Sequence, residues 1–135
     1  MTDTLSPPEL AAQLRQFTGG GGFYRHPLNP EVIYTEGVRF LAEQAEAFWL
    51  IDTIASYFGS PLMRRAITED PRLADLQFWT LTVLGLVGEL TMEADQGVPP
   101  AIRQEIPFTD FPLPIVRVWA GFNGEGWALY LPSEH

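Results

Sequence analysis

The spacing of hydrophobic and polar residues changes its period once along the chain. Up to about residue 75, apolar residues recur every three or four positions, the period of an amphipathic helix. From Leu76 onward, apolar and polar residues alternate, the period of a strand with one buried face. The pattern therefore predicts one domain, 1–135, with a mainly helical half at 1–75 and a sheet half at 76–135.

The first predicted helix covers the segment "SPPELAAQLRQF". Ser6 is a suitable N-cap, Pro7 suits the first helical position, and Glu9 completes a capping box with Ser6. Four glycines at 19–22 end this helix.

A short strand, "VIYT", and a long second helix are expected next. Thr35 is placed to cap that helix, which we expect to run unbroken over 36–59 until Gly59 and Pro61 stop it. The segment 61–73 is expected to be a short helical or irregular connection.

The second half contains five alternating segments, "LQFWTLTV", "GELTMEAD", "AIRQEIPF", "IVRVWAGF" and "GWALYLP". Their connections are short, so we expect an antiparallel meander of four or five strands with one buried face. The N-terminal helices are expected to pack on that face, which makes the fold class α+β. Charged residues are expected to form cross-strand pairs on the solvated face; they are Glu93, Arg103, Glu105 and Arg117.

The charge of the chain limits the partners it can have. Seventeen acidic and eight basic residues give a net charge of -9. This balance argues against direct nucleic-acid binding, which relies on clustered cations. It fits either a solubilising surface or an acidic face that imitates nucleic acid or docks on a basic partner protein. The sequence has no signal-peptide pattern and no apolar run long enough for a membrane span, so we expect a cytoplasmic protein.

The segment "FTGGGGFYRHPLNP", residues 17–30, holds a candidate for acid–base chemistry. His26 follows Arg25, and histidine titrates near neutral pH. The other interpretation is that Tyr24, Arg25 and His26 fix the loop, with the aromatic ring packed and a cation bonded to a carboxylate. The glycines do not form a phosphate-binding loop, because a helix precedes them and no Lys-Ser/Thr pair follows. We interpret them as a hinge.

Asp52 is the second candidate. In an unbroken helix it falls on an apolar stripe and would be buried. A buried carboxylate needs a partner, such as Arg25 or His26. The pair would then be either a structural lock between helix and loop or a catalytic dyad. If the helix instead breaks near Glu46, Asp52 becomes more exposed and this argument weakens.

Other chemistry has little support in the sequence. Cysteine is absent, the histidines His26 and His135 have no ligand spacing, and no acidic cluster has the form of a calcium loop. The serines lack the motif of a nucleophile elbow. We therefore expect neither a metal site nor a cofactor.

The turn "LGLVG" is apolar where a hairpin usually carries polar residues. Exposed Leu84, Leu86 and Val87 at one tip would indicate contact with another molecule. Burial beneath the protein's own helices explains the pattern equally well. The open edges of the predicted sheet also need a partner or protection, so we predict a homodimer that uses either the tip or a sheet edge.

Several blocks taken in order, "FYRHPL", "YTEGVRFLAE", "FWLIDTIASY", "IPFTDFPL" and "LPSEH", give the chain a resemblance to a known family. It resembles a small bacterial family of single-domain proteins found in bacterial genomes and mobile elements, whose function is unknown. The resemblance covers roughly Leu14 to His135. It implies no reaction, cofactor or catalytic residue.

The sequence favours a small acidic interaction protein without catalytic activity, an accessory of a mobile element. Its sharpest form is an inhibitor or nucleic-acid mimic that acts on a basic partner. The alternative is a small enzyme for an anionic ligand. In that case His26 and Asp52 would form an acid–base pair, with Tyr24 and Arg25 binding the ligand.

Overall fold

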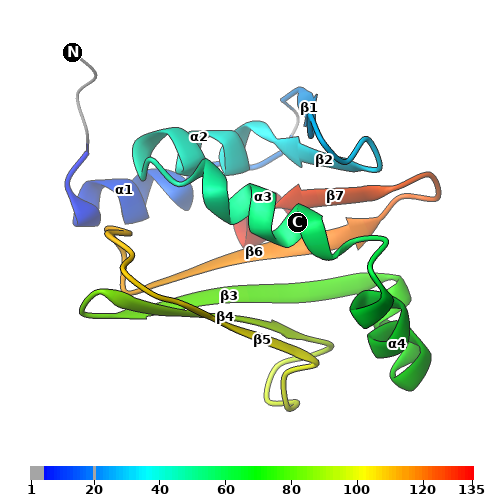
Figure 1. Cartoon of the computed structure of the whole chain (residues 1–135). Coiled ribbons are helices and arrows are strands. Elements are labelled where there is room, and N and C mark those ends of the chain that lie inside the picture. Colours follow the sequence, from blue (N-terminus) through cyan, green and yellow to red (C-terminus); the bar gives the residue numbers. More distant parts are fainter. Residues whose placement is uncertain (1–4, 20) are drawn as a thin grey trace.

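The computed structural model describes residues 5–19 and 21–135, which form four α-helices, two short 3₁₀-helices and seven strands (Figure 1). The helices are α1 (Pro7–Leu14), α2 (Glu36–Gln44), α3 (Phe48–Tyr57), α4 (Pro61–Glu69), η1 (Pro71–Ala74) and η2 (Pro132–Glu134). The strands are β1 (Phe23–Arg25), β2 (Val32–Thr35), β3 (Leu76–Leu84), β4 (Val87–Glu93), β5 (Ile102–Ile106), β6 (Ile115–Phe122) and β7 (Trp127–Tyr130).

The strands form one mixed sheet in the order β1-β2-β7-β6-β3-β4-β5. All pairs are antiparallel except β2 with β7, which is parallel. The predicted α+β class is confirmed, and the five C-terminal segments are antiparallel strands as expected.

The predicted meander is wrong in two respects. The strand β6 lies beside β3 and not beside β5, so the order β6-β3-β4-β5 is that of a Greek key. Residues 107–114 carry the chain from β5 back to β6. In addition, the strand expected at "VIYT" is confirmed as β2, but it joins this sheet beside β7, and β1, which was not predicted, pairs with it at the sheet edge. Alternation shows which residues share a face, but strand order depends on contacts distant in sequence.

The predicted long helix is two helices. Helix α2 ends at Gln44, and Glu46 adopts a left-handed backbone with φ of 52° before α3 begins at Phe48. The signals at the helix starts are confirmed. Ser6 forms the full capping box with Glu9, and Thr35 accepts the backbone N–H of Val38.

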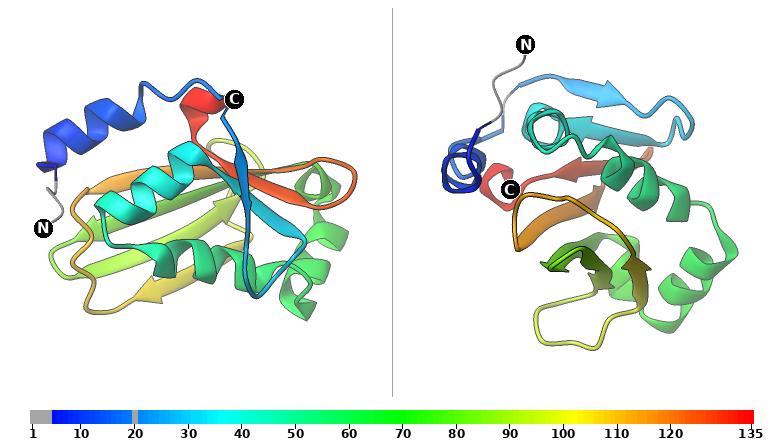
Figure 2. Two further views of the ribbon diagram at one scale, coloured as in Figure 1. Left: turned by 90° about the horizontal axis from the view of Figure 1, so that it is seen from above. Right: turned by 60° about the vertical axis from the view of Figure 1, so that its left-hand side comes forward.

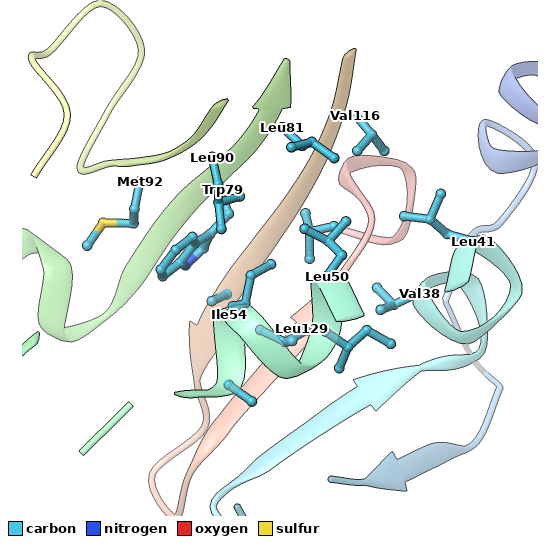
Figure 3. Close-up of a cluster of buried hydrophobic side chains, with 14 of the residues drawn as sticks. Val38, Leu41, Leu50, Ile54, Trp79, Leu81, Leu90, Met92, Val116 and Leu129 are labelled. Carbon is cyan, nitrogen blue, oxygen red and sulfur yellow. The ribbon is translucent and has the colours of Figure 1, made fainter. Parts of the chain in front are cut away.

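The hydrophobic core lies between the helices and one face of the sheet. In Figure 2 (right) the sheet curves around α3, with α2 and α3 on the same side. Figure 3 shows this contact; its labelled side chains are Val38, Leu41, Leu50 and Ile54 from the helices and Trp79, Leu81, Leu90, Met92, Val116 and Leu129 from the sheet. Helix α1 packs beside α2 and is tied to η2, where the Ser133 hydroxyl donates to the carbonyl of Leu14 at 3.0 Å.

We call the opposite side of the sheet the open face. Its central strands expose or half-bury alternate residues, among them Phe78, Thr80, Thr82, Glu89, Thr91, Glu93, Arg117, Trp119 and Tyr130. No helix in the described residues is long and apolar enough to span a membrane.

Candidate functional site

His26 is fastened to helix α3 by Asp52. Its ring nitrogen Nε2 lies 2.8 Å from Oδ1 of Asp52. Only 4% of the His26 side chain is exposed, whereas 59% of the Asp52 side chain faces solvent. The expected bond between His26 and a carboxylate is confirmed. The burial of Asp52 expected for an unbroken helix is wrong, and the stated alternative is confirmed: the helix breaks at Glu46, and α3 begins anew at Phe48 with Asp52 exposed.

The other ring nitrogen of His26 determines the tautomer. Nδ1 lies 3.1 Å from the backbone nitrogen of Leu28 and 3.0 Å from that of Asn29. Backbone N–H groups can only donate, so Nδ1 accepts both bonds and the ring proton sits on Nε2, which donates to Asp52. Both ring nitrogens are therefore used to hold the loop. This arrangement favours the structural interpretation of the pair over the catalytic one.

Asn29 anchors the same loop to the end of α3. Its Nδ2 donates to the backbone carbonyls of Ala55 at 3.0 Å and Phe58 at 3.3 Å. A hollow of about 430 Å³ opens beside His26 and Asp52. With both nitrogens engaged, His26 offers no free ring nitrogen to a molecule bound in this hollow.

Tyr24 and Arg25 lie on opposite faces of β1, because neighbouring residues of a strand alternate. The Tyr24 ring stacks on Tyr34 with centroids 5.7 Å apart, and the guanidinium of Arg39 lies 4.4 Å from its centroid. Arg25 is exposed and takes part in none of the ion pairs found among residues 5–19 and 21–135. The two residues predicted to bind a ligand therefore point to opposite sides of β1.

Three glycines of the run line a hollow of about 270 Å³ near the C-terminus. A Cβ atom on Gly21 would lie 2.3 Å from Oε2 of Glu36, so a larger residue here would displace the Glu36 carboxylate. Gly20 lies outside the described residues, and the hinge stays a prediction.

A row of aromatic side chains crosses the open face; we call Phe78, Trp119 and Tyr130 the aromatic row. Strand register places Phe78 opposite Trp119 and Trp119 opposite Tyr130. Their ring centroids are 4.9 Å and 6.2 Å apart, and both pairs meet edge to face. His135 closes the row, with its ring 5.2 Å from Trp119 and its Nδ1 3.0 Å from the Tyr130 hydroxyl. Burial raises the pKa of Tyr130, so its hydroxyl keeps its proton at physiological pH.

Trp119 stands between two hollows. One, of about 380 Å³, is lined by the Phe78 and Trp119 rings and by Glu93 and Asp95. The other, of about 510 Å³, lies between Trp119 and helix α1. The faces of aromatic rings carry negative electrostatic potential, so aromatic walls beside carboxylates suit a cation. Arg117 lines both hollows and leaves the first with two negative groups and one positive group.

Sequence reasoning missed the aromatic row. It placed four charged residues on the solvated face and expected them to pair with one another. Of these four, only Arg103 forms an ion pair within the described part of the chain, and its partner is Glu89 at 3.4 Å. The available signal was the order "RVW", which puts Trp119 on the same strand face as Arg117. A tryptophan at a polar position of a strand marks a surface that can bind.

The hairpin turn between β3 and β4 is exposed, as the contact interpretation requires. Leu84, Leu86 and Val87 all face solvent and are not covered by the helices. Two further exposed apolar residues lie near this turn: Phe108, whose neighbour Thr109 bonds to Leu86, and Ile115, the first residue of β6, which pairs with Thr82. We call these five residues the apolar tip.

Comparison with known proteins gives a family for the chain. No curated protein and no solved structure matches it. One family model matches residues 8–135, which is nearly the whole chain. This range agrees with the extent of the resemblance seen in the sequence blocks. The chain belongs to the family of unknown function DUF6876.

Proposed function

We propose that this protein is an interaction domain without catalytic activity, and that its open face binds a basic segment of a partner protein. The aromatic row with its neighbouring carboxylates carries this proposal. Phe78 and Trp119 offer two ring surfaces at nearly a right angle, 86°, beside Glu93 and Asp95. An arginine or lysine side chain would place its cation against the rings and its charge near the carboxylates.

The charge of the whole chain supports the same partner. A net charge of -9 attracts a basic segment over a distance and repels nucleic acid. The attraction is screened by salt, so association should weaken as ionic strength rises. In the most specific version of this proposal, the domain is an inhibitor that occupies the surface with which a basic protein binds its other partners. The bacterial cytoplasm and a mobile element are the setting that we propose, on the resemblance of the sequence blocks alone.

Binding of a labelled peptide tests the proposal. We expect an eight-residue peptide of alternating arginine and serine to bind the protein, as measured by fluorescence anisotropy at low and at physiological salt. Each cation–π contact contributes about 0.5 to 2 kcal/mol, so Trp119→Ala should weaken binding roughly 2- to 30-fold. Phe48→Ala is the matched control, because Phe48 is an exposed aromatic residue on α3.

The carboxylates are tested in the same assay. Glu93→Gln should weaken binding and reduce its salt dependence, whereas Glu69→Gln, at an exposed position of α4, should change neither by much. Wild-type protein that binds an alternating glutamate and serine peptide equally well would contradict the proposal. So would equal affinities of the wild type and Trp119→Ala for the basic peptide.

A further inference from the structure

We propose that the apolar tip is the contact surface of a symmetric homodimer. This surface is separate from the aromatic row. Leu84 and Val87 lie opposite each other at the end of the β3–β4 hairpin, and Ile115 begins β6 opposite Thr82, two residues before Leu84. Between the tip and the aromatic row, Thr80 pairs with Arg117, so a polar row separates the two surfaces.

Hydrogen bonds hold the tip as one surface. The backbone N–H of Thr109 donates to the carbonyl of Leu86 at 2.7 Å, and that of Val83 donates to the carbonyl of Pro114 at 2.8 Å. Both bonds join the hairpin to the chain between β5 and β6. Two segments distant in sequence therefore present their apolar side chains together in a fixed arrangement.

Phe108 is the most unusual residue of the tip. Its side chain is 90% exposed, and its backbone has a φ of +57°. The left-handed region is sterically unfavourable for a bulky residue and is usually taken by glycine. The monomer gains little packing from this side chain in return. A strained position that presents an exposed aromatic ring is the arrangement expected of an anchor for a partner.

The exposed area of the tip suits a small dimer interface. The exposed fractions are 87% for Leu84, 64% for Leu86, 47% for Val87, 90% for Phe108 and 40% for Ile115. At about 150 to 200 Å² for each whole residue, they expose roughly 500 to 650 Å² in total. Few monomeric proteins expose an apolar patch larger than roughly 300 to 600 Å². Two tips together would bury roughly 1,000 to 1,300 Å², near the lower end of the range for specific interfaces.

The lack of charge on the tip residues suits a second copy as the occupant. Two molecules that each carry a net charge of -9 repel each other over most of their surfaces. The five residues of the tip are uncharged, so two copies can meet there without opposing like charges. The five residues themselves offer no carboxylate to a basic partner; Asp110 and Glu89 lie beside the tip, and Glu89 is paired with Arg103. A patch that contacts its own copy about a two-fold axis also forms a closed assembly and not a filament.

Light scattering coupled to size-exclusion chromatography tests the dimer. We expect the wild type to shift from monomer to dimer as its concentration rises through the micromolar range. Leu86→Asp and Phe108→Asp should remain monomeric, with unchanged circular dichroism, because both side chains are exposed. Leu28→Asp is the matched control, since Leu28 is 85% exposed on another loop, and it should dimerise like the wild type.

Phe108→Gly separates the interface from the fold. Glycine accepts a positive φ, so this variant should melt a few degrees higher than the wild type as a monomer while its dimer is lost. A wild type that stays monomeric at several hundred micromolar would overturn the proposal. A dimer that persists in both aspartate variants would also overturn it and would place the contact elsewhere, for example at the exposed edge of β5.

Discussion

Replacing Asp52 with alanine removes the acceptor for the Nε2 proton of His26 and tests whether this pair locks the loop onto α3. The bond is 2.8 Å long, and its donor belongs to a side chain that is 96% buried. Water can reach the aspartate but reaches the buried ring poorly. The substitution therefore leaves the ring proton without an adequate partner, which destabilises the folded state.

The size of the effect follows from the exposure of the two groups. A hydrogen bond to a charged group contributes about 1.5 to 3 kcal/mol. Because 59% of the Asp52 side chain is exposed, solvent competes for it and the lower end applies. We therefore expect Asp52→Ala to lose about 1.5 kcal/mol of unfolding free energy, or about 5 °C in melting temperature for a chain of this length. Asp52→Asn keeps an acceptor oxygen and should lose about 0.5 kcal/mol.

A double-mutant cycle isolates the bond from other effects of the substitutions. Asp52→Ala, His26→Ala and the double variant would each be unfolded with urea and followed by circular dichroism. Helix propensity at position 52 and the bonds to Nδ1 of His26 cancel in the cycle. We expect a coupling energy of about 1 to 1.5 kcal/mol. Additivity within about 0.3 kcal/mol would refute the reasoning, because the pair would then contribute nothing as a pair.

Three further predictions concern stability. Phe108→Gly should raise the unfolding free energy of the monomer by about 1 kcal/mol, because the left-handed backbone no longer carries a Cβ atom; an unchanged or lower thermal midpoint would contradict this. Gln77→Ala should lower the free energy of unfolding in urea by roughly 2 to 4 kcal/mol, because it leaves the buried indole N–H of Trp79 and the backbone carbonyl of Leu73 unpaired. The control Gln13→Ala, at an exposed position, should change it by less than about 0.5 kcal/mol. Burial raises the pKa of Tyr57 above its usual value of about 10. The contribution of its protonated hydroxyl to the free energy of unfolding is therefore complete below pH 10 and is lost as pH rises through the folded-state pKa. Tyr57→Phe should flatten this part of the curve of unfolding free energy against pH.

The parts of the fold that depend on neighbours in sequence could be predicted. The capping box of Ser6 and the cap by Thr35 are local chemistry, and both helix starts are correct. A break near Glu46 was an alternative that the sequence could not favour, because apolar spacing continues through this point and no glycine marks the left-handed residue. The parallel pairing of β2 with β7 joins residues almost a hundred positions apart, and alternation carries no information about it.

The candidate site was predictable to a similar extent. The need of Asp52 for a partner led to the bond with His26, although the carboxylate proved to be exposed. The tautomer depends on two backbone N–H groups in a turn, which no sequence motif specifies. The aromatic row forms only when β3, β6 and β7 lie side by side in this order, and the sequence does not specify that order. The one indication in the sequence was Trp119, a large ring at a polar position of its strand.

The proposal that the open face binds a basic segment is tested most directly by nuclear magnetic resonance. The alternating arginine and serine peptide would be added to ¹⁵N-labelled protein, and the shifts of amide and indole signals would be followed. We expect the largest changes in β3, β6 and β7, at Glu93 at the end of β4 and at the indole N–H of Trp119, with little change at the indole of Trp79, which is buried on the helix side of the sheet. Changes confined to the apolar tip or to α3, or an unshifted Trp119 indole at saturating peptide, would contradict the proposal.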